Sequence, residues 1–169
     1  MKSERGDGGI GEVSINRKTG VPTYPFTEVF KGFEKVDAVK EIFGKSTKRT
    51  LNNLRVSLYR SRRGGYMWID DKAGCIVCNL DYLRSASKTY IYLDVIHELV
   101  HIKQLHAGRA LFDSRYHYLD RPTELEAYRV AIDEARRTGM GKKELTEYLK
   151  VEWVTKKEFA RFLGRFGLR

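Results

Sequence analysis

The stretch VIHELVHIKQ, residues 95–104, places two histidines and a glutamate inside a run that is otherwise mostly aliphatic. On a helix, His97 and His101 fall about 40° apart, one turn above each other. Aliphatic side chains occupy most of the remaining circumference, which predicts a buried helix. Two unpaired imidazoles and the carboxylate of Glu98 would be costly in an apolar interior. We therefore expect His97 and His101 to bind a metal cation, with Glu98 beside it.

The pattern H-E-x-x-H, present here as HELVH, is typical of zinc sites on helices, and a catalytic zinc needs a third protein ligand. Two glutamates near the start of a helix expected over residues 123–137 are available for this role. Glu124 and Glu126 are two residues apart, so a helix directs them about 160° apart and only one can bind. Thr123 and Glu126 fit a capping box, which gives Glu126 a structural role. Glu124 is therefore the preferred third ligand, and Glu126 is the alternative.

The elements around this helix predict an α+β fold, with a small antiparallel or mixed sheet packed on the buried helix. Residues 54–59 alternate in polarity as a strand does, and residues 65–80 read as a hairpin with a turn at residues 71–74. Helical periodicity predicts helices over residues 26–44, 87–105, 123–137, 142–153 and 155–167. In the last of these, Thr155 and Glu158 form a second capping-box pattern.

The chain has 169 residues, a usual size for one domain with one core. Residues 1–22 are rich in glycine and polar side chains, so we expect a flexible N-terminal arm. We expect residues 23–169 to form a single domain, in which residues from about 140 to 169 are a C-terminal helical extension.

Two segments together resemble the gluzincin class of zinc metallopeptidases: HELVH at residues 97–101 and TELEAYRVA at residues 123–131. Within that class the pattern is most similar to the ImmA/IrrE-like peptidases, whose second helix carries E-x-x-A-N-x-F-A. Three positions of that motif match, and two differ: Tyr128 stands at the asparagine and Val130 at the phenylalanine. The matching positions are Glu124, Ala127 and Ala131. The resemblance covers roughly residues 50–137.

The resemblance implies a zincin-like domain, in which a sheet of three or more strands lies beside the active-site helix. An edge strand, residues 65–70 or residues 75–80, would then bind an extended peptide by β-augmentation. It further implies that Glu98 is the general base in a metal-assisted hydrolysis.

Hydrolysis of a peptide bond also needs a donor for the negative charge that develops on the substrate oxygen. The aromatic loop SRYHYLDR, residues 114–121, offers His117 and Tyr118, and we expect one of them to act there. The alternative is that these aromatic side chains only pack the loop. Asp94, three residues before His97, is a candidate hydrogen-bond partner for a ligand histidine.

The net charge of +10 is unevenly distributed along the chain. Residues 45–65 carry seven Lys and Arg and no acidic residue, and residues 135–169 carry ten against four Glu. These two basic patches are candidate contacts for nucleic acid or for an acidic partner. With two cysteines, no signal-peptide pattern and no apolar run near 18 residues, we expect a cytoplasmic protein that does not span a membrane.

The sequence thus predicts a zinc-dependent metalloprotease that hydrolyses peptide bonds in an intracellular protein, with Glu98 as general base. The alternative is a basic nucleic-acid-binding protein with a structural or vestigial zinc site. Glu98 favours the enzyme, because a purely structural site needs no base beside its ligands.

Overall fold

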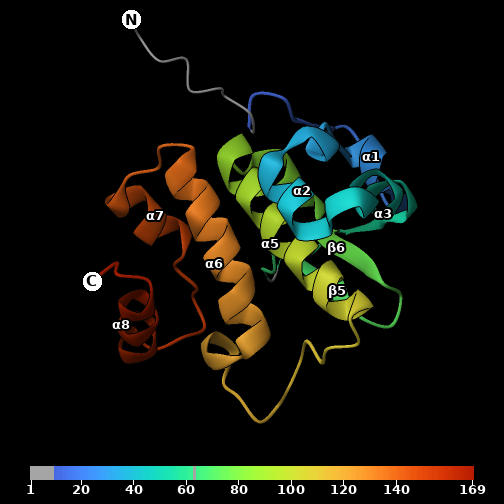
Figure 1. The fold of residues 1–169 in the computed structure, drawn as a ribbon. Helices are drawn as coiled ribbons and strands as arrows, with labels where there is room; N and C mark the ends of the chain where they lie inside the picture. The colour runs from blue at the N-terminus through green and yellow to red at the C-terminus, as the bar shows by residue number, and fades with distance from the viewer. Residues whose placement is uncertain (1–9, 63) are drawn as a thin grey trace, which may run out of the picture.

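The computed structural model describes residues 10–62 and 64–169 and shows an α+β fold (Figure 1). The strands are β1 Ser14–Ile15, β2 Thr23–Pro25, β3 Phe30–Lys31, β4 Arg55–Tyr59, β5 Met67–Asp70 and β6 Cys75–Asn79. The α-helices are α1 Phe26–Val29, α2 Asp37–Phe43, α3 Thr47–Asn53, α4 Leu80–Ser85, α5 Lys88–His106, α6 Pro122–Arg137, α7 Lys142–Tyr148 and α8 Lys156–Arg165. Short 3-10 helices cover η1 Phe33–Lys35, η2 Gly44–Ser46 and η3 Tyr118–Asp120.

The main sheet has four strands in the order β2-β4-β6-β5. The strands β4 and β6 are parallel, whereas β2 and β5 pair antiparallel with their neighbours, so the sheet is mixed. The expected strand at residues 54–59 and the expected hairpin at residues 65–80 are confirmed. Of the two strands expected to bind a peptide, β6 lies inside the sheet and only β5 lies at its edge.

Helix α5 lies at the centre of the molecule and contacts α6, α2 and β5 (Figure 1). It begins after Ser87, whose hydroxyl accepts a hydrogen bond of 3.1 Å from the backbone N–H of Tyr90. Every residue from Val95 to Ile102 is buried, as the apolar circumference predicts. The expected bounds of α5 and α6 are confirmed to within one residue at each end.

The long helix expected over residues 26–44 is wrong. Strand β3 interrupts it by pairing with β1, and Gly32 follows with a φ of +85°. A Cβ atom at Gly32 would lie 2.2 Å from the carbonyl oxygen of Glu12, so only glycine fits there. The helical periodicity instead comes from apolar side chains of several short elements that meet in the core, among them Phe26, Phe30 and Phe33.

We expect Gly32→Ala to lower the free energy of unfolding by about 2–4 kcal/mol, since it adds left-handed backbone strain to a steric clash. The matched control is Gly20→Ala, because a Cβ atom added at Gly20 would meet no other part of the chain within 4 Å and Gly20 has no positive φ. Urea unfolding followed by circular dichroism measures both variants. Equal stability of the two variants would contradict the close approach of Glu12 to Gly32.

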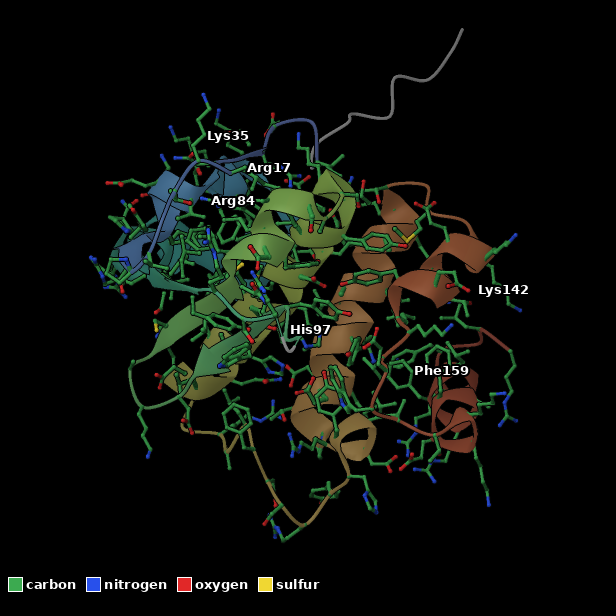
Figure 2. The ribbon with its side chains drawn as sticks, turned by 180° about the vertical axis from the view of Figure 1, so that it is seen from behind. Arg17, Lys35, Arg84, His97, Lys142 and Phe159 are labelled. Carbon is green, nitrogen blue, oxygen red and sulfur yellow. The ribbon has the colours of Figure 1, made fainter. Side chains whose placement is uncertain are left out.

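The flexible arm expected over residues 1–22 needs correction for the part that the structure describes. Val13 and Thr19 are buried, and Arg17 donates a 2.7 Å hydrogen bond to the carbonyl of Leu83. Residues 10–22 therefore pack on the body of the protein, and Figure 2 shows Arg17 on the same side of the molecule as Lys35 and Arg84. Residues 1–9 lie outside the described residues, so the expectation for them stays a prediction.

The C-terminal helices share the apolar core with the rest of the chain. Phe162, Leu163 and Leu168 belong to the same buried cluster as the sheet and α5. Asp120 of η3 accepts hydrogen bonds of 2.6 and 2.7 Å from Arg161 and Arg165 of α8. The capping box at Thr155 is confirmed.

Helix α7 ends at Tyr148, five residues before the expected end at residue 153. The chain between α7 and α8 therefore runs as a connector, residues 149–155. Among the described residues, none of the helices combines the length and the apolar character that crossing a bilayer requires.

Candidate metal centre

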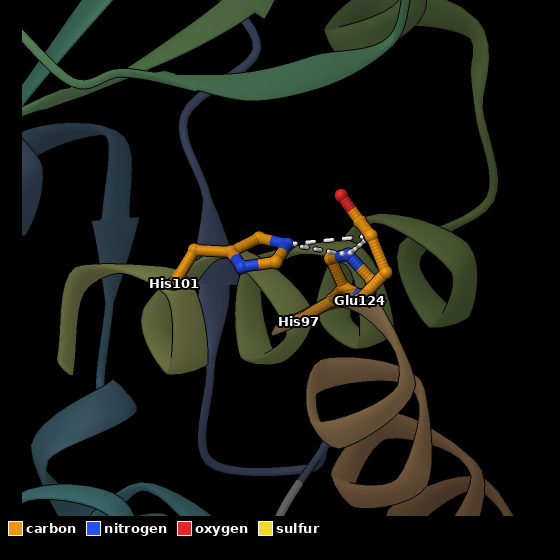
Figure 3. Close-up of side chains that lie close together, drawn as sticks. All are labelled: His97, His101 and Glu124. Atoms are coloured by element: carbon orange, nitrogen blue, oxygen red, sulfur yellow. Dashed lines mark hydrogen bonds and ion pairs between the residues drawn. The ribbon is translucent and has the colours of Figure 1, made fainter. Parts of the chain in front are cut away.

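Two consecutive long helices bring three ligand side chains together. His97 and His101 project from adjacent turns of α5, and Glu124 projects from the first turn of α6 (Figure 3). The two Nε2 atoms lie 3.1 Å apart. The Oε2 atom of Glu124 lies 3.2 Å from Nε2 of His97 and 3.4 Å from Nε2 of His101. All three side chains are buried.

This triangle of donor atoms fits one small cation. Three ligands at about 2.0–2.1 Å from a tetrahedral zinc ion are roughly 3.3–3.4 Å apart, close to the separations of 3.1–3.4 Å found here. Two imidazole nitrogens and one carboxylate oxygen are also the donor types that zinc accepts. Among the described residues, His97, His101 and Glu124 are the one group of potential ligand side chains that lie close enough together to hold a metal ion.

The choice of Glu124 over Glu126 agrees with the geometry, but the capping-box reason for it was wrong. Helix α6 begins at Pro122, and its N-cap position has no side-chain hydrogen bond. Glu126 instead accepts a hydrogen bond of 3.0 Å from Nε2 of Gln104 and an ion pair from Arg109. Its carboxylate is thus engaged away from the two histidines.

Gln104 holds the second histidine in place. Its Oε1 atom lies 2.7 Å from Nδ1 of His101, so the imidazole donates at Nδ1 and keeps Nε2 free for a cation. Its Nε2 atom donates to the carbonyl of Thr123 and to Glu126, which ties α5 to the start of α6. With only 1% of its surface exposed, Gln104 is fixed in this orientation.

Asp94 does not have the role expected for it. Its carboxylate accepts hydrogen bonds from the hydroxyls of Tyr82 and Tyr148 rather than from a ligand histidine. The sequence could have indicated Gln104 instead, because a polar residue three positions after His101 lies on the same face of the helix.

We expect Gln104→Leu to raise the dissociation constant for zinc by about 10–100-fold, since loss of a ligand's hydrogen-bond partner has that effect in other metal sites. The adjacent exposed residue provides the matched control, Lys103→Leu, which should leave metal affinity unchanged. Competition with a chromophoric chelator measures both dissociation constants. Equal affinities in the two variants would show that Gln104 does not orient His101.

Glu98 is a buried carboxylate with an uncommitted oxygen. It is 6% exposed and lines the same cavity as the three ligand residues. Within the described part of the chain, its Oε2 atom has no hydrogen-bond partner. Burial raises the pKa of Glu98 to about 8, and the nearby carboxylates of Glu124 and Asp94 act in the same direction. This carboxylate can therefore accept and release a proton near neutral pH.

The three ligand side chains perturb one another strongly. Burial raises the pKa of Glu124, but hydrogen bonds with His101 and His97 outweigh it and bring that pKa to about 2. Burial lowers the pKa of His97. Burial acts in the same direction on His101, but the hydrogen bond to Glu124 and the charge of Glu98 raise its pKa to about 9. The negative charge of the Glu124 carboxylate thus favours a positive charge between the three side chains.

The three ligands open onto a cavity of about 460 Å³ between β5, α5, α6 and the connector that follows α7. His97 lies in the middle of the molecule, where α5 faces α6 (Figure 2). The walls include Met67 and Ile69 of β5, Leu149 and Val151 beyond α7, and Trp153. A chain bound along β5 would therefore pass the ligand side chains.

Of the two residues expected to stabilise charge on the substrate, only Tyr118 lies at the cavity. Its hydroxyl is 2.9 Å from that of Tyr128, and burial holds its pKa well above the usual range, so the phenol keeps its proton. His117 is exposed and lies outside this cavity, so its expected role is wrong. The backbone turns at η3, which directs these adjacent side chains to different places.

Tyr128 is a site residue that the sequence reasoning did not assign. Its ring packs against the ring of His97 with centroids 4.4 Å apart and limits the rotation of that imidazole. Its position one turn after Glu124 places it on the ligand face of α6, and this spacing could have indicated it.

Comparisons with family models, with curated proteins and with solved structures found no match for this chain. The role of the candidate metal centre is therefore inferred from its own geometry and chemistry.

Proposed function

We propose that this protein is a zinc-dependent peptidase of the zincin type, which hydrolyses peptide bonds in an intracellular protein. The observation that carries the proposal is the combination of three convergent ligand atoms with the uncommitted carboxylate of Glu98 in one cavity. A structural zinc site closes all four positions with protein ligands, whereas three ligands beside a base are typical of a hydrolytic site.

Zinc held by His97, His101 and Glu124 would supply the Lewis acidity that polarises a carbonyl and activates water near neutral pH. Oε2 of Glu98 accepts the proton of the attacking water and passes it to the nitrogen of the leaving amine. The group must bind the proton and release it in each cycle, and Oε2 of Glu98 is available for both because it has no hydrogen-bond partner among the described residues.

Tyr118 is the proposed donor to the negative charge that develops on the carbonyl oxygen of the substrate. Its phenol is protonated and borders the cavity that Glu98 lines. The hydrogen bond with Tyr128 holds its hydroxyl in position.

The open edge of β5 is the proposed binding site for the substrate backbone. A peptide that adds to this edge gains main-chain hydrogen bonds without a requirement for particular side chains. Because β5 borders the cavity, the added strand would present its peptide bonds to the metal centre.

The test of this proposal is digestion of a proteome-derived peptide mixture by zinc-loaded protein, analysed by mass spectrometry for new termini. We expect new termini that disappear with a chelator and return when zinc is restored. A protein that holds one equivalent of zinc but produces no new termini from any peptide would overturn the proposal.

Nucleic-acid binding is the second proposal, and the exposed basic side chains of the patch at residues 45–65 support it. They include Lys45, Lys48, Arg49, Arg55 and Arg62. If this patch contacts phosphates, affinity for a DNA or RNA duplex will fall steeply as salt rises. An affinity that does not change between low and moderate salt would exclude this role.

A further inference from the structure

The cavity continues beyond the metal centre toward the start of α5, where it contains a second carboxylate. Asp94 lies three residues before His97, which corresponds to a rise of about 4.5 Å along the helix. The side chain borders the cavity and is partly exposed to it. An extended peptide advances roughly 3.3 Å per residue, so for a substrate that runs along α5 the rise between Asp94 and His97 corresponds to one or two substrate residues.

Two tyrosines contact this carboxylate, and a further tyrosine packs against each of them. Tyr82 of α4 and Tyr148 of α7 donate hydrogen bonds to the two oxygens of Asp94, the second at 2.8 Å. A further tyrosine packs against each donor: Tyr66 on Tyr82 with centroids 5.0 Å apart, and Tyr90 on Tyr148 with centroids 5.1 Å apart. All four rings line the cavity. We refer to Asp94 and these four tyrosines as the tyrosine box.

The charge of Asp94 is not balanced by a basic side chain. Across residues 10–62 and 64–169, the hydrogen bonds of its carboxylate come from the two tyrosines, and no ion pair joins it to Lys or Arg. Burial raises the pKa of Asp94 to about 6, and the hydrogen bonds of Tyr82 and Tyr148 oppose that rise. The group is therefore ionised at neutral pH in a setting that makes an unpaired charge costly.

We propose that the tyrosine box binds a lysine or arginine side chain of the peptide substrate, within one or two residues of the bond that is cleaved. This inference rests on the proposed peptidase function and names its specificity. Aromatic rings around a carboxylate recognise a cation with an apolar stem, because the rings cover the stem and attract the charge while the carboxylate pairs with it. The two accepted hydrogen bonds leave lone pairs on Asp94 for such a pairing.

Other occupants fit the tyrosine box less well. An acidic substrate side chain would face Asp94, and Glu147 also lies in the lining on that side. A neutral aliphatic side chain would leave the carboxylate unpaired after excluding water from it. A second metal ion lacks ligands, because Asp94 belongs to no group of metal-binding side chains in the described residues. Lys150 also borders the cavity but is exposed and makes no ion pair with Asp94 in that part of the chain.

A binding measurement that needs no turnover tests this assignment. Zinc-loaded protein carrying Glu98→Gln is titrated with hexapeptides Ac-Ala-Ala-X-Ala-Ala-Ala-NH2, in which X is lysine, arginine, norleucine or glutamate. Intrinsic fluorescence reports binding, because the chain has two tryptophans and both, Trp68 and Trp153, line the cavity. We expect the lysine and arginine peptides to bind about tenfold or more tightly than the norleucine peptide, and the glutamate peptide to bind most weakly.

Two variants separate the tyrosine box from a purely structural role of Asp94. In Asp94→Asn the affinity for the lysine peptide should fall to that for the norleucine peptide. The control Asp133→Asn, on the exposed face of α6, should leave the affinities for both peptides unchanged. Tyr90→Leu leaves both hydrogen bonds of Asp94 in place and should still weaken binding of the lysine peptide severalfold. Equal affinity for lysine and norleucine, or no binding of the lysine peptide at millimolar concentration, overturns the proposal. A lysine preference without cleavage by the unmodified protein would overturn the peptidase function alone.

Discussion

Replacement of Glu98 by glutamine should lower kcat for peptide hydrolysis by about a thousandfold, while the protein keeps its metal. General acid–base catalysis by one positioned group contributes about 10²–10⁴-fold, and the expected loss for this buried base with a free oxygen is the middle of that range. Glutamine has the same shape but cannot accept the proton of the attacking water. The variant should therefore bind substrate and zinc as the unmodified protein does.

The measurement combines steady-state hydrolysis of a fluorogenic peptide with metal analysis of the same sample. The matched control is Glu152→Gln, an exposed position outside the cavity, which should retain full activity. If Glu98→Gln retains most of the activity with a full complement of zinc, another residue is the base. If it loses both zinc and activity, Glu98 supports the metal site rather than the chemistry.

The convergence of the candidate metal ligands can be predicted from sequence because its main features are local. His97 and His101 are related by one helical turn, and the apolar run around them fixes which face is buried. Helical spacing also limits the third ligand to Glu124 or Glu126, but the capping box expected at Glu126 is wrong, since this residue pairs with Arg109 and Gln104. Spacing within a helix limits which side chains converge, whereas the partner of each remaining carboxylate depends on tertiary contacts.

The tyrosine box shows the limit of this reasoning. Tyr90 lies one turn before Asp94 on α5, but Tyr82 and Tyr148 lie on α4 and α7, and no repeat or spacing in the chain connects these two to Asp94. Their association depends on how α4 and α7 pack around α5. The broken helix at residues 26–44 has a similar origin, because pairing of β1 with β3 and the close approach of Glu12 to Gly32 override the local periodicity.

Replacement of Glu124 by glutamine should weaken zinc binding by more than a hundredfold. Loss of an outer hydrogen-bond partner already reduces affinity by about 10–100-fold in metal sites, and Glu124 is a direct ligand in the proposed site. It also supplies the negative charge that offsets a divalent cation between two neutral imidazoles. Glutamine preserves the volume of the side chain but offers a weaker, uncharged oxygen.

The competing ligand assignment makes Glu126→Gln the natural control. Glutamine at that position still offers an oxygen to Nε2 of Gln104, so zinc affinity should change no more than severalfold. Melting temperature supplies an independent readout, because a cation at a hundred times its dissociation constant stabilises the folded state by about 2.7 kcal/mol. Zinc should therefore raise the melting temperature of the unmodified protein and of Glu126→Gln, but not that of Glu124→Gln at the same concentration. If zinc raises the melting temperature of Glu124→Gln but not that of Glu126→Gln, the third ligand is Glu126. That result would contradict the convergence of α5 and α6 at Glu124.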